Sequence, residues 1–94
     1  MKPRRQVLLE EAIQLTTTDR NKDYGNPEDN FRNIADYWNV YQRQRGCEST
    51  PQDVAMLMIL VKVARLATNP THFDSLVDIA GYAACAADCH QILI

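Results

Sequence analysis

Apolar residues recur at helical spacing in four segments of the chain, with polar stretches between them. In the first segment, from about Arg4 to Thr17, the apolar side chains cover one broad face. In the second, which begins at Pro27 and ends at Gly46, apolar and aromatic residues recur at intervals of three and four. Alternation typical of strands is nearly absent. The pattern predicts an all-α fold.

The third segment has no polar residue between Val54 and Val61. A helix that is apolar all round lies in the centre of a fold or at a subunit interface. Thr50 followed by Asp53 is a capping-box pattern at its start, and we expect the helix to end near Ala67. This segment therefore predicts either the central helix of the fold or a helix at a subunit interface.

The fourth segment begins at residues 71–73 and runs to about Gln91, with Gly81 among alanines. Glycine in a helix interior costs about 1 kcal/mol relative to alanine, so Gly81 indicates close approach of another backbone or of a ligand. Asp74, Asp78 and Gly81 fall on one stripe of this helix. The stripe predicts either a pocket floor or tight packing within the fold or across a dimer axis.

Length and composition limit the number of domains and the partners that the protein can have. The chain has 94 residues, of which 46% are hydrophobic, and a formal net charge of −2. These values predict one globular domain over residues 1–94, a four-helix bundle with a modest core that homo-oligomerises. The charge argues against nonspecific binding of nucleic acid, and no apolar run reaches membrane-spanning length. We expect a cytoplasmic protein with no membrane partner.

The three cysteines are an odd number, and their spacing matches no disulfide framework. Cys85 and Cys89 share a helical face next to His90, whereas Cys47 and His72 lie far away in the sequence. A zinc site needs four convergent ligands, so we interpret the cysteines as small core residues in a reducing compartment. We expect no metal there.

Four charges near the third and fourth helices predict a cluster inside the helical core. Lys62 and Arg65 lie one turn apart, and Asp74 and Asp78 follow, also one turn apart. Charges are rarely buried unless paired. The cluster is either a structural ion pair with Asp74 or Asp78, or a clamp for a phosphate or carboxylate. The two aspartates also suit a shared divalent metal, although Asp74 alone is a typical helix-start acid.

The polar segment 19–26 is the second candidate for binding. Arg20 and Lys22 supply cations, Tyr24 supplies a face on which a base can stack, and Asn26 followed by Pro27 begins a helix. A helix N-terminus is a natural anion site. The alternative is an ordinary connecting loop, and the P-loop motif is absent.

Five motifs occur in order between about Leu9 and Ala87. They are Asp19-Arg-Asn-Lys-Asp-Tyr-Gly25, Asn30-Phe-Arg-Asn-Ile-Ala35, Thr50-Pro-Gln-Asp-Val54, Leu60-Val-Lys-Val-Ala-Arg65 and Asp74-Ser-Leu-Val-Asp-Ile-Ala-Gly-Tyr82. Through these motifs the chain resembles a family of short all-helical domains encoded by bacteriophages and prophages. That family has no settled biochemical function.

A more distant likeness lies in Lys-x-x-Arg followed by Asp-x-x-x-Asp-x-x-x-Tyr. This pattern, which ends at Tyr82, resembles nucleotide-modification-associated phage domains. The layout is also similar to MazG-like all-α nucleoside triphosphate pyrophosphohydrolases, which hold Mg²⁺ with four acids. The chain departs from them, because its first helix offers Glu10-Glu11 instead of Glu-x-x-Glu. The resemblance therefore implies nucleotide binding more strongly than hydrolysis.

The combined prediction is a phage protein that binds a nucleotide-like phosphate ligand without a cofactor, between the third and fourth helices and the 19–26 segment. It would serve nucleotide metabolism or sequester a host nucleotide signal, an anti-defence role. The phosphates would meet Arg20, Lys22, Lys62 and Arg65. The base would meet Tyr24, Trp38 or Tyr82. Asp74 and Asp78 would hold the cations or bind ribose hydroxyls.

Two alternatives belong to other classes. One is a Mg²⁺-dependent pyrophosphohydrolase in which Glu11, Asp74 and Asp78 hold the metal. The other is a host-protein interaction module, in which the charged cluster is structural and the apolar third helix docks the partner.

Overall fold

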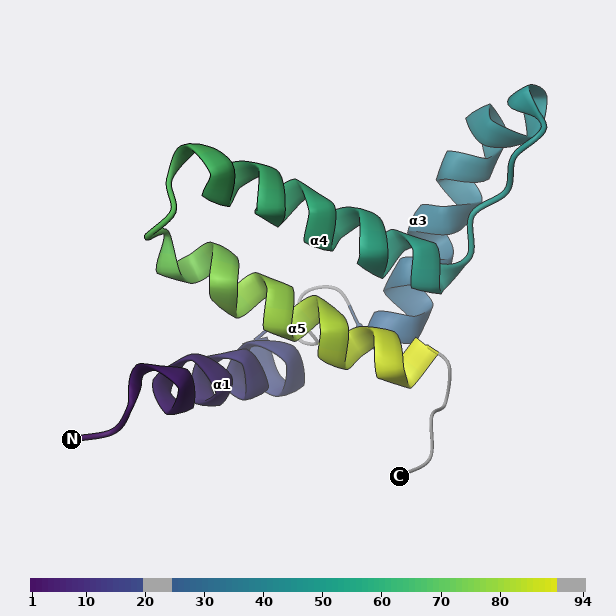
Figure 1. Ribbon diagram of the computed structural model, residues 1–94. Helices are drawn as coiled ribbons and strands as arrows, with labels where there is room; N and C mark the ends of the chain where they lie inside the picture. Colours follow the sequence, from purple (N-terminus) through teal and green to yellow (C-terminus); the bar gives the residue numbers. More distant parts are fainter. Residues whose placement is uncertain (20–24, 90–94) are drawn as a thin grey trace.

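The computed structural model describes residues 1–19 and 25–89 of the chain (Figure 1). These residues form four α-helices: α1 (Arg4–Gln14), α3 (Pro27–Gln42), α4 (Pro51–Thr68) and α5 (Phe73–Cys89). Two short segments extend the first two, the π-helical η1 (Leu15–Asp19) and the 3-10 turn η2 (Arg43–Arg45). No strand occurs in the described part, and the prediction of an all-α fold with four helices is confirmed.

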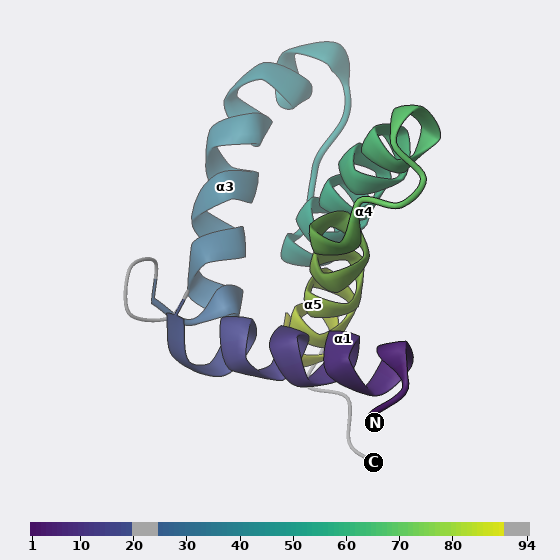
Figure 2. The same ribbon diagram turned by 90° about the vertical axis from the view of Figure 1, so that its left-hand side faces the viewer.

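Helix α5 lies at the centre of the molecule. It runs antiparallel to α4 and also contacts α1 and α3, whereas α1 contacts neither α3 nor α4 within the described ranges (Figures 1 and 2). The predicted bundle is therefore not confirmed as a closed arrangement. The central position predicted for the third helix belongs to the fourth, because α4 buries only Val54 and Ala55 deeply.

The core lies where α3, the start of α4 and the second half of α5 meet. Its buried members are Phe31, Ala35, Val54, Ala55, Tyr82, Cys85 and Ala86. On α3 these residues recur at a spacing of four, which places them on one face of the helix. The core is thus concentrated at one end of the α4–α5 pair, and the rest of the pair has fewer neighbours.

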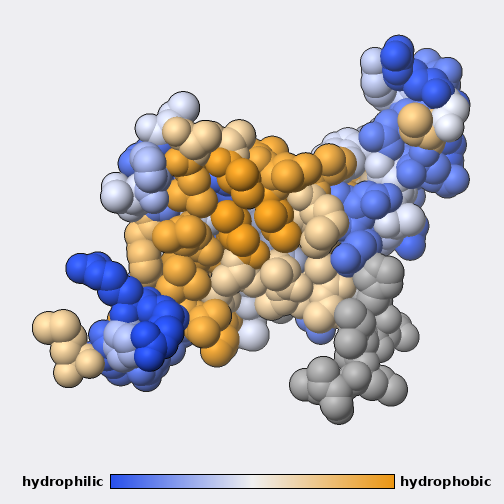
Figure 3. All heavy atoms as spheres, in the orientation of Figure 1, coloured by the Kyte–Doolittle hydropathy of each residue, from blue (hydrophilic) through white to orange (hydrophobic). Residues whose placement is uncertain are grey.

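A broad apolar surface covers the side of α4 and α5 that carries no other helix (Figure 3). Figure 2 shows that α3 lies on the opposite side of the pair. The large exposed apolar residues on the pair are Met56, Leu57, Leu60, Val61, Val63 and Leu76. None of the helices is long and apolar enough to cross a membrane, for the residues that the structure describes.

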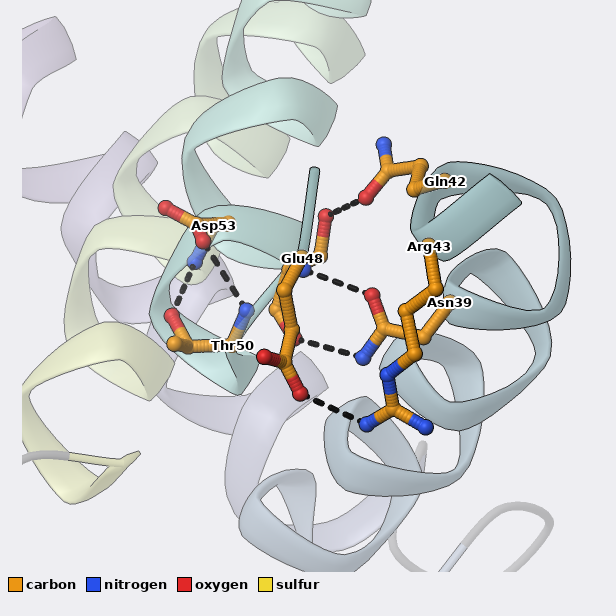
Figure 4. A network of polar contacts seen from close by, with 7 residues as sticks. Asn39, Gln42, Arg43, Glu48, Thr50 and Asp53 are labelled. Carbon is orange, nitrogen blue, oxygen red and sulfur yellow. Dashed lines mark hydrogen bonds and ion pairs between the residues drawn. The ribbon is translucent and has the colours of Figure 1, made fainter. Parts of the chain in front are cut away.

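The far end of α3 projects beyond the other helices (Figure 1). The radius of gyration is consequently 14.5 Å, whereas a compact domain of this length would have about 12 Å. The buried amide of Asn39 attaches the return segment to this arm: its Nδ2 donates to the Ser49 carbonyl (3.0 Å), and its Oδ1 accepts from the Ser49 amide (2.6 Å; Figure 4).

Local signals in the sequence set the helix boundaries. The capping box is confirmed, since Thr50 Oγ1 accepts from the Asp53 amide (3.2 Å) and Asp53 Oδ2 accepts from the Thr50 amide (2.9 Å; Figure 4). Gly46 ends η2 with φ of +78°, a conformation that favours glycine. Asn26 occupies the predicted N-cap of α3, but its side chain makes no capping hydrogen bond.

Candidate functional site

An open groove of about 410 Å³ lies between α1 and α5. Its lining residues are Glu11 and Gln14 from α1, Leu15 from the start of η1, and Asp74, Val77 and Asp78 from α5. Each helix contributes positions i, i+3 and i+4, which share one face. Three carboxylates therefore border one groove. The groove lies between the first and fourth helices, whereas the sequence predicted a binding site between the third and fourth helices and the 19–26 segment.

Asp78 is the groove carboxylate that has a cationic partner. Its Oδ2 lies 3.2 Å from Lys62 Nζ on α4, and the two side chains are 24% and 14% exposed. Glu11 and Asp74 are exposed and form no ion pair with any residue in the described ranges. The groove thus carries a net negative charge, and the Lys62–Asp78 contact matches the ion-pair alternative.

The predicted four-residue cluster does not assemble inside the core. Arg65 is exposed on α4 and forms no ion pair with a described residue. Asp74 is exposed in the first turn of α5. The cluster prediction was wrong because spacing within each helix does not determine which members face the other helix. Only Lys62 and Asp78 meet.

A small cavity of about 20 Å³ lies beside the groove, and both are lined by Leu15 and Asp78. Its other lining residues are Thr16, Gly25, Pro27, Asn30, Phe31, Gly81, Tyr82 and Cys85. This volume admits about one water molecule. In this arrangement the cavity is too small for a phosphate group, although it lies at the predicted anion site, the start of α3.

Gly81 faces the segment that follows α1. A Cβ atom at this position would lie 3.3 Å from Thr16 Cγ2. The predicted close approach is therefore made by a threonine side chain on η1. Hydroxyl groups of the three threonines bond to the carbonyls four residues earlier: Thr16 to Ala12 (2.7 Å), Thr17 to Ile13 (2.6 Å) and Thr18 to Gln14 (2.5 Å). Such back-bonding is known to bend helices, and here it accompanies the π-helical turn.

The aromatic candidates lie in different surroundings. Tyr82 is buried, and its ring contacts Phe31 with a centroid distance of 6.1 Å. Trp38 is half-buried against the core and lines a second open groove of about 290 Å³, together with Tyr41, Gln42 and Leu57. Arg20, Lys22 and Tyr24 lie outside the described residues.

The described residues offer no ready metal site. No three histidine, cysteine, aspartate or glutamate side chains among them converge closely enough to hold an ion. Glu11, Asp74 and Asp78, the Mg²⁺ ligands of the enzyme alternative, line one groove without forming such a group. As it stands, the site does not fit a resident magnesium ion.

The three cysteines lie in different surroundings. Cys47 is exposed, Cys85 is buried and Cys89 is half-buried. Burial raises the pKa of the Cys89 thiol, and the nearby acids Glu28 and Asp88 raise it further. These environments agree with packing roles for Cys85 and Cys89.

Sequence reasoning missed three lining residues of the groove: Gln14, Leu15 and Val77. Each lies three or four residues from a carboxylate that had been considered, since Glu11 precedes Gln14 and Leu15, and Asp74 precedes Val77. Helical spacing could have identified them. It could not have shown that these two helix faces meet.

Comparisons with known proteins identify the family of the chain. A family model described as a domain of unknown function (DUF6378) matches residues 7–90. The Gene 55 protein of Mycobacterium phage L5 is 46% identical over 76 residues, which cover 81% of this chain and 47% of that protein. The Gene 55 protein of Mycobacterium phage D29 is 46% identical over 84 residues, which cover 89% of this chain and 54% of that protein.

The chain spans about half the length of the curated relatives it matches. No solved structure matches it. The MazG-like resemblance finds no support among these matches, whereas the expected likeness to phage domains of unknown function is confirmed. The family match covers most of the helical fold and all six lining residues of the α1–α5 groove. The chain is therefore a member of the DUF6378 family, whose function is unknown and whose relatives here are bacteriophage proteins.

Proposed function

We propose that this protein binds a nucleotide-like phosphate ligand in the α1–α5 groove. The observation that carries the proposal is the groove itself, an open space of about 410 Å³ bordered by polar groups from two helices. Small-molecule sites commonly measure about 300–1,000 Å³ and contain a few convergent polar groups. The size and the lining support a ligand of nucleotide dimensions.

The charge of the groove decides how a phosphate would bind. Glu11 and Asp74 have no cationic partner among the described residues, and Lys62 is engaged with Asp78. Carboxylates repel phosphate, whereas Mg²⁺ is commonly held by one or two carboxylates together with phosphate oxygens. We therefore expect binding to require a divalent cation supplied with the nucleotide. This proposal differs from the expectation of binding without a cofactor, which stays a prediction.

Lys62 is a cation at the edge of the groove, because its partner Asp78 lines it. A phosphate that displaced Asp78 from Lys62 would gain a point-charge donor. Arg65 is less suited to this role, since it is exposed on α4 and is not a lining residue. Tyr82 is a poor surface for a base, since its ring is buried against Phe31. Arg20, Lys22 and Tyr24, which lie outside the described residues, remain proposed contacts.

The test is a thermal-shift screen of nucleotides with and without Mg²⁺. A bound nucleotide at one hundred times its Kd should stabilise the protein by about 2.7 kcal/mol. Asp74→Asn should remove the response. Asp36→Asn, which changes an exposed helical aspartate on α3, should leave it intact. The proposal fails if no nucleotide shifts the melting temperature, or if both variants respond like the wild type.

Hydrolysis is the second candidate, because the three acids of the enzyme alternative border the same groove. The absence of a three-ligand group among the described residues makes it the weaker candidate. Release of pyrophosphate that depends on Mg²⁺ and is lost in Glu11→Gln would favour an enzyme. Binding without product release would favour a carrier or a sequestering protein.

A further inference from the structure

We propose that the exposed apolar face of the α4–α5 pair is a homodimer interface, in which α4 of one copy packs on α5 of the other. Of the large side chains exposed on this pair, Leu57 lines the groove beside Trp38 of α3 and is not part of this face. Figure 3 shows apolar atoms gathered over both helices. Monomeric soluble proteins rarely expose a contiguous apolar surface of several hundred Å². The inference is independent of the proposed ligand.

On this face the side chains of α4 are bulky, whereas those of α5 are mostly small. On α4 the positions i, i+4 and i+7 are Met56, Leu60 and Val63, all exposed at 39–60%. On α5 the equivalent spacing carries Leu76, Ala80 and Ala83, so that this helix is flatter. None of these six positions is charged, and burying them against a second copy would therefore leave no charge unpaired. A row of bulky side chains thus runs beside a row that is mostly alanine.

A two-fold rotation brings the bulky side chains of α4 opposite the small side chains of α5 in the other copy, so the surface is complementary to itself. An axis parallel to the helices, between two facing copies, places α4 over α5 of the partner subunit. Because α4 and α5 are antiparallel within one chain, the helices that face one another across the interface are antiparallel too. The bulky row of each copy then meets the alanine row of the other. The contact is closed and isologous, which is the commonest form of homo-oligomer, and it completes a four-helix arrangement.

The interface is large enough for a specific dimer. Helices of 18 and 17 residues are about 25 Å long, and a packed pair is about 20 Å wide. The face therefore measures about 500 Å² on each copy, or about 1,000 Å² in total, which is the lower bound expected of a specific interface.

The ion pair between Lys62 and Asp78 shows which positions of α4 and α5 lie at the same level within one chain. Positions on α4 and α5 that sum to about 140 lie at the same level, so Leu60 is level with Ala80. Under the two-fold rotation, Leu60 should contact Ala80 of the partner subunit. Leu60 of the two copies should lie diagonally apart.

The first test is the mass of the full chain in solution, by light scattering at micromolar concentration. We expect a dimer, and Val63→Glu should raise its Kd by more than about tenfold, since it places a charge in the apolar contact. The matched control is Val40→Glu, which introduces the same charge at an exposed valine on α3 and should leave the dimer intact. A monomeric wild-type chain, or equal dimers in both variants, would overturn the proposal.

The second test identifies the helices in contact. Leu60→Cys and Ala80→Cys are made separately with Cys47→Ser, which removes the exposed native thiol. The mixed variants should form a disulfide-linked dimer under mild oxidation, and neither variant alone should do so. Cross-linking of Leu60→Cys with itself would exclude the proposed axis. A chain that stays monomeric until a host protein or the remainder of a longer relative covers the face would give no cross-link.

Discussion

The acidic groove and the apolar face lie on different sides of α5. Both are exposed to water, but the free-energy cost of that exposure differs between them. Glu11 and Asp74 in the groove are well solvated carboxylates, and such groups cost little on a surface. Met56, Leu60 and Val63 on the face expose apolar area, which disfavours the isolated chain by about 25 cal/mol for each Å². The apolar face is therefore the stronger sign of a missing partner.

The groove differs from the face in one further respect, because it contains a partly buried ion pair. Lys62 and Asp78 retain only 14% and 24% of their side-chain exposure. Taking charges out of water is expensive unless they are paired. The ion pair therefore connects α4 to the groove, whereas the six positions compared on the apolar face carry no charge. This contrast leads to four predictions, given from the largest effect to the smallest.

The largest effect is expected at the ion pair. Lys62→Ala should destabilise the chain by about 3 kcal/mol, the lower end of the range for removing one partner of a buried pair, since both side chains keep some contact with water. Urea denaturation measures the free energy of unfolding. Replacing both residues, as Lys62→Met with Asp78→Leu, should recover much of the loss. A loss below about 0.5 kcal/mol, typical of a surface pair, would show that the pair is effectively solvated.

The two sides of α5 should respond differently to added bulk. Gly81→Leu should cost about 2 kcal/mol, because its side chain would collide with Thr16 on η1 and overpacking is destabilising. Ala83→Leu adds bulk on the exposed side of the same helix and should leave the stability of the single chain nearly unchanged. Denaturation at low protein concentration compares them. Equal losses would mean that the α5 face is already covered.

Protein concentration should affect stability through the apolar face. If the face dimerises, a hundredfold increase in concentration stabilises each chain by about 1.4 kcal/mol, which raises Tm by roughly 5 °C or more for a domain of this size. Thermal scans of wild type and Val63→Glu at two concentrations measure this. A Tm that is independent of concentration in the wild type contradicts a dimer.

The smallest effect concerns thiol reactivity. At pH 8 the exposed Cys47 should be alkylated first and the buried Cys85 last. Cys89 should react slowly, because its raised pKa keeps it protonated. The stability that the neutral Cys89 thiol contributes is fully present below the ordinary pKa of a thiol and is lost as the pH rises through its raised pKa. Mass spectrometry of alkylated peptides orders the three sites, and rapid reaction of Cys85 would indicate local opening around the small cavity.

Local signals in the sequence were enough to place the helices. Apolar periodicity, the capping box at Thr50 and Asp53, and the left-handed Gly46 act over a few residues, so their structural effects can be read locally. The sequence also identified an apolar α4 and a close contact at Gly81, since both depart from ordinary helix composition. Its likeness to phage domains followed from motifs spread along the chain.

The choice of which helix faces meet depends on the packing of the whole chain. Spacing placed Asp74 and Asp78 on one side of α5 but could not show that Lys62 reaches Asp78 alone, or that Arg65 stays exposed. It could not place Glu11 across from them, because the α1–α5 contact joins residues far apart in the sequence. Such contacts depend on the packing of whole helices, which depends on the combined shape of many side chains and has no local signal.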